Sequence, residues 1–419
     1  MVSRFVVRQF ACIAFVAQGL SANTLNVAID DKEVPFHSLW LRERCLESFY
    51  VDPKTKQRHY GLHDEEESLK ALTAIAHGSH VEVFFSDGQS CNISVLLIKS
   101  EMSLASETTI QVSAYEPPPV HLWTASSMNL TTVDYNSYFE DPSSRFHVMK
   151  ELLSSGVVML TGVPQELDAV FSVGNNLSLW RPTFWGSTFR VRVEDDGDFA
   201  DLAYTDQAIA FHTDGPYLTP PPDYQLLHSL QGCSGSDCKT INLFVDAWHV
   251  ASKLYQVDPD AFAVLTKIPL RWENNGGDDS TAAVRYAPMI ELAHSQSTVG
   301  GIPQIRTVQF SSKSGGYSPS LPTETLESLY RAQRKFARMM NDPANTFTVH
   351  LDPGAMVVFD NTRVVHARSA IPKEERSRWL QGGYMTRDAL LMNYEQLRRK
   401  LPPQIPECVA PKAFVSVKG

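Results

Sequence analysis

The chain has 419 residues, of which 43% are hydrophobic, 20% charged and 10% aromatic, a composition typical of a globular protein with one large core and one smaller core. Its formal net charge of −10 and the absence of a long Lys/Arg run argue against nucleic acid or an anionic membrane surface as the main partner. The sequence therefore favours a small-molecule partner, and it leaves open whether the chain forms a homodimer.

The first 22 residues form a distinct segment. They contain Arg4 and Arg8, no acidic residue, and an apolar centre too short to span a bilayer. This pattern indicates a mitochondrial or secretory targeting segment, or an additional first strand or helix. No other stretch of the sequence predicts a transmembrane helix.

Residues 23–115 contain short runs in which apolar and polar residues alternate, such as TLNVAID, HVEVFFSD and CNISVLLI. Alternation with a period of two is typical of half-buried strands, so we expect a small β-rich N-terminal domain. The motif YEPPPVHLW begins at residue 115, and its prolines stiffen the backbone. We therefore expect a linker over residues 116–140.

Residues 141–419 combine strands with a few helices. Helical patterns occur at 141–155, VDAWHVASKLYQV and ETLESLYRAQRKFARMMND, and apolar β-runs occur at VVMLTGV, YQLLHSL and TFTVHLDPGAMVVFDN. These elements show no regular β-α-β rhythm. The pattern favours a mainly β domain with flanking helices, a jelly roll or sandwich rather than a doubly wound sheet.

The six cysteines are scattered and form no dense framework, which favours reduced thiols inside a cell. Cys233 and Cys238 are close enough in sequence to form a disulfide or half of a metal site. Because no second pair completes four ligands, we expect them to be free thiols in a loop.

The motif AFHTDGPYLTPPP contains His212 and Asp214 two positions apart. In an extended chain, positions i and i+2 point the same way, so a His-x-Asp pair can supply two ligands of a 2-His-1-carboxylate metal site. A second His-x-Asp pair, His350 and Asp352, shows that chance is a serious alternative. The only histidine after it is 14 residues on, too close to return from a separate strand, so we interpret His350 as a strand residue that runs into a turn.

His366 is the better partner for the first pair. It lies 154 residues after His212, at the end of VVFDNTRVVHAR, which we interpret as a core strand. Arg378 follows 12 residues later, where an antiparallel return strand could direct its guanidinium toward the metal. A bidentate cation suits the second carboxylate of 2-oxoglutarate, whose first carboxylate and keto oxygen chelate iron. The triad leaves three coordination positions on Fe(II), two for 2-oxoglutarate and one for O₂.

Four blocks carry a resemblance to a known family. AYTDQAIAFHTDGPYLTPPPDYQLLH, FVDAWHVASKL, LDPGAMVVFDNTRVVHAR and GGYMTRDALL resemble the γ-butyrobetaine and trimethyllysine dioxygenases, iron(II) and 2-oxoglutarate enzymes of the taurine-dioxygenase superfamily. The resemblance begins at about residue 35 and keeps the family's order and spacing. It implies a double-stranded β-helix, with His212, Asp214 and His366 as iron ligands and Arg378 as the 2-oxoglutarate clamp.

The sequence departs from that family in two places. The N-terminal domain of γ-butyrobetaine dioxygenases holds a structural zinc, but here only Cys45 matches its ligands, and Glu47, Tyr50 and Gln89 stand at the other positions. We therefore expect no zinc, because one soft ligand cannot hold it tetrahedrally. Near 2-oxoglutarate, Asn242 stands where the family tends to have Ser or Thr.

The resemblance also implies a substrate pocket. The family binds a quaternary ammonium in an aromatic cage, because ring faces attract a cation. The alternative is that these aromatic residues only pack the mouth of the barrel. The matching positions here are Trp185, Phe189, Tyr204 and Tyr384.

Polar positions indicate a changed substrate. Asp201 matches an acid of the trimethyllysine enzymes that could pair with a substrate amino group. The carboxylate-binding asparagines of the family appear as Ser311 and Ser312, and Gly215 stands where a tyrosine is common.

These observations predict an iron(II)/2-oxoglutarate-dependent dioxygenase that oxidises an unactivated C–H bond of a small amine, amino acid or betaine, with hydroxylation as the favoured outcome. A tailoring oxygenase of specialised metabolism, which hydroxylates, desaturates or cyclises another substrate, is the alternative, and a non-catalytic binding protein on the same fold is more remote. Because the cosubstrate is a metabolite of the cell interior, we expect a cytoplasmic or mitochondrial location.

Overall fold

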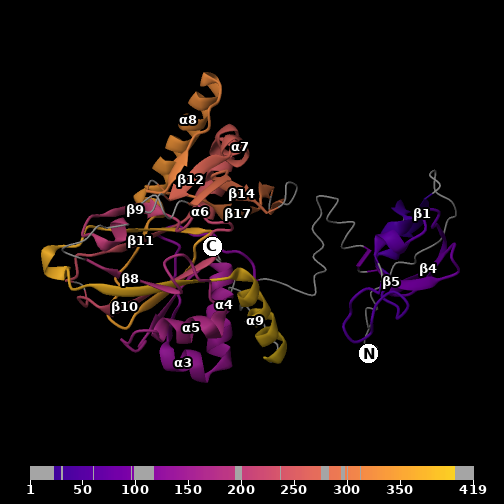
Figure 1. The fold of residues 1–419 in the computed structure, drawn as a ribbon, viewed down its shortest axis with the longest axis horizontal. Coiled ribbons are helices and arrows are strands. Elements are labelled where there is room, and N and C mark those ends of the chain that lie inside the picture. Colours follow the sequence, from indigo (N-terminus) through magenta and orange to yellow (C-terminus); the bar gives the residue numbers. More distant parts are fainter. Residues whose placement is uncertain are drawn as a thin grey trace, which may run out of the picture. The chain divides into compact units, whose positions relative to one another are not determined.

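The computed structural model describes residues 23–29, 32–59, 61–95, 97–98, 118–193, 201–235, 237–274, 283–293, 298–299, 301–311 and 313–401. The chain divides into two compact units, Met1–Glu116 and Pro117–Gly419 (Figure 1). The N-terminal segment 1–22 and Ser312 lie outside the described residues. Among the residues that the structure describes, no helix combines the length and apolar character needed to cross a bilayer.

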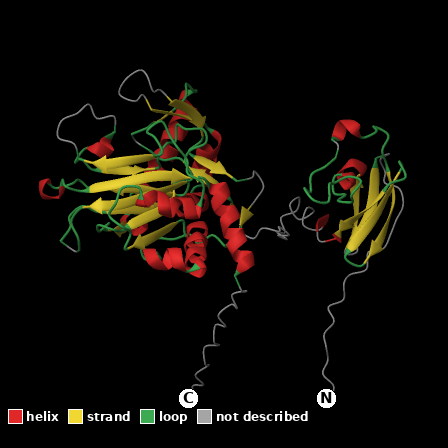
Figure 2. Cartoon of the chain, turned by 60° about the horizontal axis from the view of Figure 1, so that its bottom comes forward, coloured by secondary structure: helices red, strands yellow, loops and turns green. Residues whose placement is uncertain are grey.

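The first unit is rich in strands, as its alternating sequence predicts (Figure 2). In β4, Val81, Val83 and Phe85 are buried, and the residues between them are more exposed. These side chains form the core of a three-stranded antiparallel sheet, next to a separate hairpin. The elements are β1 (Thr24–Ile29), β2 (Lys32–His37), α1 (Ser38–Arg42), η1 (Leu62–Asp64), β3 (Ala71–His77), β4 (His80–Phe85) and β5 (Ser90–Ser94).

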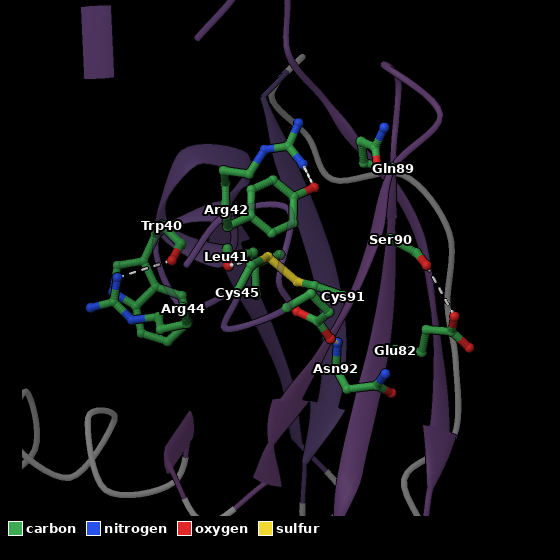
Figure 3. The surroundings of a disulfide bond; sticks show 12 residues. Trp40, Leu41, Arg42, Arg44, Cys45, Glu82, Gln89, Ser90, Cys91 and Asn92 are labelled. Atoms are coloured by element: carbon green, nitrogen blue, oxygen red, sulfur yellow. Dashed lines mark hydrogen bonds between the residues drawn. A yellow bond between two sulfur atoms is a disulfide. The ribbon is translucent and has the colours of Figure 1, made fainter. Parts of the chain in front are cut away.

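Two disulfides correct the expectation of reduced cysteines. Cys45, just after α1, is bonded to Cys91 on β5, and both side chains are buried (Figure 3). Cys233 and Cys238 form the second bond, after strand β10 (Tyr224–Gln231). Cys45 and Cys91 could not be paired from the sequence because residues 46 positions apart meet only after the sheet has formed, whereas the disulfide of Cys233 and Cys238, 5 residues apart, is the alternative that was set aside there.

The Cys45–Cys91 disulfide also bears on the expected absence of zinc from the first unit. The sequence argument considered Cys45 alone, whereas the structure places ligand atoms of Cys45, Glu47 and Cys91 within 4.8 Å of one another. With both sulfurs joined in a disulfide, neither is available as a thiolate ligand. The absence of zinc stays a prediction.

We expect Cys91→Ser to lower the free energy of unfolding of the first unit, measured in the full chain, by about 2 to 5 kcal/mol. The reason is that the disulfide closes a long loop and so reduces the conformational entropy of the unfolded chain. Urea unfolding followed by fluorescence, with and without a reducing agent, measures the change. Reductant should destabilise the wild type to a similar extent and leave the variant's first transition unaffected. An equal effect of reductant on both proteins would contradict the assignment.

The second unit contains two large sheets. The six-stranded sheet has the order β6-β7-β20-β10-β22-β8, and the four-stranded sheet has the order β19-β11-β21-β9. Their bounds are β6 (Thr132–Asp134), β7 (Val157–Thr161), β8 (Thr188–Arg192), β9 (Ile209–His212), β10 (Tyr224–Gln231), β11 (Asn242–Asp246), β19 (Phe347–Val349), β20 (Met356–Asp360), β21 (Val364–Arg368) and β22 (Trp379–Met385).

The two sheets pack face to face and bury a shared core. Phe244 on β11 and Phe359 on β20 have ring centroids 5.4 Å apart, and Leu227 and Val364 belong to the same buried cluster. This arrangement is the mainly β jelly roll that the sequence predicts.

Helices cover the outside of this jelly roll (Figure 1). α4 and α5 pack on the six-stranded sheet, with α3 and α9 beside them, whereas α6, α7 and α8 share a second core with the short strands. The helices are α3 (Tyr135–Glu140), α4 (Pro142–Ser154), α5 (Ala169–Leu177), α6 (Ala247–Val257), α7 (Pro259–Lys267), α8 (Thr323–Met340) and α9 (Arg387–Lys400). The short strands are β12 (Leu270–Asn274), β13 (Ala283–Ala287), β14 (Ile290–Leu292), β15 (Thr298–Val299), β16 (Ile302–Pro303), β17 (Ile305–Val308) and β18 (Gly315–Tyr317).

Two expectations about this unit were wrong. Residues 118–140 are not a linker: Trp123 is buried and its Nε1–H donates to the Ser155 carbonyl, and this segment also contains β6 and α3. VVFDNTRVVHAR is not one strand: β20 and β21 lie in different sheets. The connection is tight because Thr362 donates from both its N–H and its hydroxyl to Asp360.

A buried ion pair joins this connection to the rest of the unit. Arg363 donates from Nε and Nη2 to the two carboxylate oxygens of Asp246, at 3.1 and 2.7 Å. The same guanidinium donates to the backbone carbonyls of Ser154 and His121, and both charged side chains are essentially inaccessible. The pair therefore links the last residue of β11 to the start of β21 and to the last residue of α4.

We expect Arg363→Met to lower the free energy of unfolding by about 3 to 5 kcal/mol, because it leaves the Asp246 carboxylate buried and unpaired. Urea denaturation of the full chain is the measurement. Arg331→Met is the matched control, because Arg331 pairs with Asp258 but its side chain is 53% exposed, and it should cost much less than Arg363→Met. Equal losses in the two variants would contradict this assignment.

Candidate active site

The pairing of β9 with β21 brings two histidines together. His212 on β9 is the direct partner of His366 on β21, and their ring centroids are 4.2 Å apart. Asp214 follows β9, and its Oδ1 lies 3.3 Å from His212 Nε2. One ligand atom from each of the three residues lies within 4.8 Å of the others.

The protonation of this cluster suits a divalent metal. Burial, followed by the charge of His212, lowers the pKa of His366 to about 3, so its imidazole is neutral. His212 Nδ1 lies 2.9 Å from the Ala210 carbonyl, which can only accept, so Nδ1 carries a proton and Nε2 is the ring nitrogen that faces Asp214. Burial would raise the pKa of Asp214, but the neighbouring imidazoles of His212 and His366 hold that pKa well below its usual range.

These donors fit ferrous iron. Two imidazoles and one carboxylate are the ligands of the 2-His-1-carboxylate site. His366 Nδ1 is buried and has no hydrogen-bond partner among the described residues.

The turn that carries Asp214 is held by Asn361, which the sequence analysis missed. Asn361 Oδ1 accepts the Asp214 N–H at 2.8 Å, and Asn361 Nδ2 donates to the Asp214 carbonyl at 2.9 Å and to the Pro222 carbonyl at 3.0 Å. Asn361 lies between β20 and β21, beside the strand that carries His366. Its position in FDNTR, next to a core strand, was the only sequence signal.

Tyr384 also holds this carboxylate. Its hydroxyl donates to Asp214 Oδ2 at 2.9 Å, and burial raises its pKa well above the usual value, so the donor proton is retained. The sequence analysis assigned Tyr384 only to the aromatic cage. The structure shows a hydrogen bond to the candidate metal ligand.

Arg378 and Asn242, the residues expected at 2-oxoglutarate, are hydrogen-bonded to each other. Arg378 Nη2 donates to Asn242 Oδ1 at 3.0 Å, and burial lowers the arginine pKa to about 9, so the guanidinium remains charged near neutral pH. Arg378 precedes β22, which pairs with β10 and β8 in the six-stranded sheet. The antiparallel return strand expected after His366 is therefore β22. It does not pair with β21 but faces it from the opposite sheet.

All the predicted site residues line one cavity of about 480 Å³. It is lined by the three candidate ligands and by Arg378, Asn242, Trp185, Phe189, Asp201, Tyr204 and Tyr384. His350 is not among them; it is exposed and lies one residue beyond the end of β19, so it leads into the expected turn but is not itself a strand residue. Gln225, Tyr217, Arg368 and Lys313 also line the cavity and were missed.

The aromatic residues form two groups in this cavity. Phe189 and Tyr384 have ring centroids 5.2 Å apart, and Trp185 lies edge-on to Tyr217 at 6.3 Å. Gly382 on β22 makes room for Phe189, because a Cβ there would lie 2.5 Å from its ring and 2.8 Å from a backbone carbonyl. Tyr204 ends the short helix η2 (Leu202–Tyr204). Whether these rings form a cation cage stays a prediction.

Asp201 already has a charged partner. Its two carboxylate oxygens each lie 3.0 Å from Lys313 Nζ. Lys313 follows Ser311, which is buried, and the sequence analysis had considered only the serines of VQFSSK at this place. Gly215, where the family often has tyrosine, has a φ of 61°, which favours glycine.

The structure combines two facing sheets with a cluster of two histidines and an aspartate at the β9–β21 pair. This combination defines a class of protein, the non-haem iron oxygenases with a 2-His-1-carboxylate site. Residues 115–384 match the model of the taurine catabolism dioxygenase TauD, TfdA family. The chain belongs to this family of iron(II)/2-oxoglutarate-dependent dioxygenases.

Curated relatives resemble the chain over most of its length. A γ-butyrobetaine dioxygenase of Pseudomonas sp. (strain AK-1) is 28% identical over 94% of this chain and 98% of its own length. The mitochondrial trimethyllysine dioxygenase of Bos taurus is 25% identical over 85% of this chain and 81% of its own. Among solved structures, an asparagine oxygenase in complex with Fe(II), 3-hydroxyasparagine and succinate aligns with a TM-score of 0.44 and 15% identity, over 60% of this chain and 81% of that chain.

We expect Tyr384→Phe to weaken metal binding by about 10- to 100-fold, because partners of metal ligands orient them and tune their charge. Anaerobic calorimetric titration of the full chain with Fe(II) or Mn(II) measures the affinity. Tyr217→Phe is the matched control: Tyr217 lines the same cavity, but no hydrogen bond to Asp214 is found for its hydroxyl among the described residues. Equal metal affinities in the wild type and Tyr384→Phe would contradict a role for this hydroxyl.

Proposed function

We propose that His212, Asp214 and His366 bind Fe(II), that Arg378 and Asn242 bind 2-oxoglutarate, and that the enzyme oxidises an unactivated C–H bond of a small amine, amino acid or betaine. One observation carries the proposal: the β9–β21 register gathers two imidazoles and a carboxylate in the wall of a cavity of about 480 Å³. A cavity of this size suits a small molecule beside a bound cosubstrate.

Arg378 supplies the charge that 2-oxoglutarate requires. Its guanidinium is buried, carries a positive charge near neutral pH and is oriented by Asn242. A planar guanidinium binds a carboxylate through two parallel hydrogen bonds, which fixes the direction of the cosubstrate. Asn242 would act as a positioning residue for Arg378.

The bound iron, with 2-oxoglutarate and O₂, supplies the oxidising power for cleavage of an unactivated C–H bond. The protein's residues orient the groups around that bond. Asn361 and Tyr384 hold Asp214, and the aromatic side chains exclude water from the cavity wall. Hydroxylation is the favoured outcome, and trimethyllysine and γ-butyrobetaine are the model substrates because the relatives' names specify them.

A second candidate function is a tailoring oxygenase that acts on another substrate. The observation that favours it is Lys313, a cation in the cavity wall that would repel a substrate carrying only a quaternary ammonium.

The curated relatives include mitochondrial enzymes, which supports a cytoplasmic or mitochondrial location. A homodimer remains a proposal.

We expect His366→Ala to abolish iron-dependent conversion of 2-oxoglutarate to succinate, because two remaining ligands hold ferrous iron poorly. His350→Ala is the matched control and should retain wild-type turnover, because His350 lies outside the cavity. Succinate is measured over a panel of amines, amino acids and betaines, with unfolding curves as a check on folding. Near-normal succinate formation by folded His366→Ala would refute the ligand assignment.

A further inference from the structure

The connection between β10 and β11 crosses from one sheet to the other. β10 belongs to the six-stranded sheet and β11 to the four-stranded sheet, and residues 232–241 join them. Within this connection, the disulfide of Cys233 and Cys238 closes a short loop. Among the described residues, one hydrogen bond attaches this loop to the rest of the unit, from the Gly235 N–H to Asp352 Oδ1 at 3.1 Å. The disulfide is therefore the main constraint on the shape of the loop.

Both ends of the connection contact Arg378. Its first residue, Gly232, lies against the arginine side chain, because a Cβ on Gly232 would be 3.9 Å from Arg378 Cγ. Its far end leads into Asn242, whose Oδ1 accepts from Arg378 Nη2 at 3.0 Å. Arg378 is buried, and the connection forms part of its cover.

Glu375, the last residue of η4 (Lys373–Glu375), links the connection to the backbone of Arg378. Its carboxylate accepts the N–H groups of Lys239 and Thr240, at 2.7 and 2.9 Å. Its carbonyl accepts the Arg378 N–H at 3.0 Å. A change of shape in the disulfide loop therefore reaches Arg378 through the single residue Glu375.

The disulfide and Arg378 also share a small cavity. Its volume of about 20 Å³ is room for about one water molecule, and its lining includes Gly232, Cys233, Cys238, Asn242 and Arg378. Arg378 and Asn242 also line the large cavity, so these two residues lie between the disulfide and the candidate active site. Opening the disulfide would remove one wall of the small cavity and admit water beside the guanidinium.

The disulfide is accessible to a reductant at one of its two cysteines. Cys233 is half-buried and is followed by the exposed residues Ser234 and Gly235, whereas Cys238 is buried. A thiolate of a dithiol reductant attacks the Cys233 sulfur, and the S–S bond breaks with its electron pair on Cys238. The second thiolate of the reductant then displaces Cys233, so the reductant becomes a disulfide and the protein gains two electrons. The two cysteine thiolates take up the two protons that the reductant lost.

We propose that the disulfide of Cys233 and Cys238 is a reversible redox site that controls the affinity of Arg378 for the second carboxylate of 2-oxoglutarate. The oxidised loop holds Gly232 and Asn242 against the arginine. Reduction frees the loop, hydrates the guanidinium and weakens its contact with the carboxylate. The inference rests on the proposed role of Arg378. It agrees with the proposed location, because disulfides inside cells are usually transient and catalytic or redox-sensing.

Calorimetric titration of the full-length, Mn(II)-loaded enzyme with 2-oxoglutarate tests the redox site. One sample is oxidised, and the other is reduced with dithiothreitol, which is removed under anaerobic conditions before the metal is added. Reduction should lower the affinity for 2-oxoglutarate about tenfold, as expected for the loss of a hydrogen bond to a charged group, and reoxidation should restore it. The affinity for Mn(II) should stay the same, because the candidate metal ligands do not line the small cavity.

A ligand without the second carboxylate separates Arg378 from the rest of the site. 2-Oxobutyrate keeps the 2-oxo acid group that would chelate the metal but offers no carboxylate to Arg378. Its affinity should therefore be the same in the oxidised and the reduced enzyme. An equal loss of affinity for both acids would indicate a general loss of structure and would overturn the inference.

Two double variants assign the effect to one disulfide. Cys233→Ser combined with Cys238→Ser should show the low affinity of the reduced enzyme under both conditions. Cys45→Ser combined with Cys91→Ser is the matched control and should keep the wild-type response, because that disulfide lies in the core of the first unit. Tight binding by the first double variant, equal to that of the oxidised wild type, would refute the redox site.

The wild type gives a result that does not depend on the folding of any variant. Alkylation and mass spectrometry should find Cys233 and Cys238 protected in the oxidised sample, and free thiols at both positions would overturn the inference. 2-Oxoglutarate binding that is unchanged by reduction refutes only the redox site. Absence of 2-oxoglutarate binding in both samples contradicts the proposed function, and the inference fails with it.

Discussion

The antiparallel pairing of β9 with β21 determines the chemistry of the cavity, because it places His212 opposite His366. Side chains of directly paired residues lie on the same face of a sheet, here the face toward the second sheet. A shift of one residue would turn one histidine to the outside. The register is fixed nearby: β21 continues from the tight turn after β20, and Arg363 in this turn is held by Asp246 in the interior.

The candidate metal ligands depend on neighbours that are themselves buried and hydrogen-bonded. Asn361 bonds both backbone groups of Asp214, and the Tyr384 hydroxyl bonds its carboxylate. These contacts hold the backbone and the carboxylate of Asp214 from the six-stranded sheet, since Asn361 follows β20 and Tyr384 belongs to β22. A ligand set held in this way is pre-organised, so metal binding does not have to order it.

Charge is distributed unevenly along the cavity. Arg378 and Asn242 place a hydrogen-bonded cation in one part of the cavity, whereas Asp201 and Lys313 provide two opposite charges near one another. Aromatic rings occupy the wall between polar groups. This combination differs from a purely cationic or purely aromatic pocket.

The sequence by itself determined the candidate ligands and the main elements of the fold. His212 and Asp214 are close in sequence on an extended segment, His366 is part of an apolar run, and the periods of α4, α6, α8 and β4 follow from local alternation of polar and apolar residues. Arg378 was indicated by its spacing after His366 and by the family resemblance, whereas the cavity aromatics came from the resemblance alone. Only the tertiary structure decided that Cys45 meets Cys91, that β20 and β21 lie in different sheets, that Tyr384 bonds Asp214 and that Asp201 pairs with Lys313. The physical reason is that local periodicity reports which face of an element is buried, whereas contacts between residues far apart in sequence depend on how the sheets pair and pack.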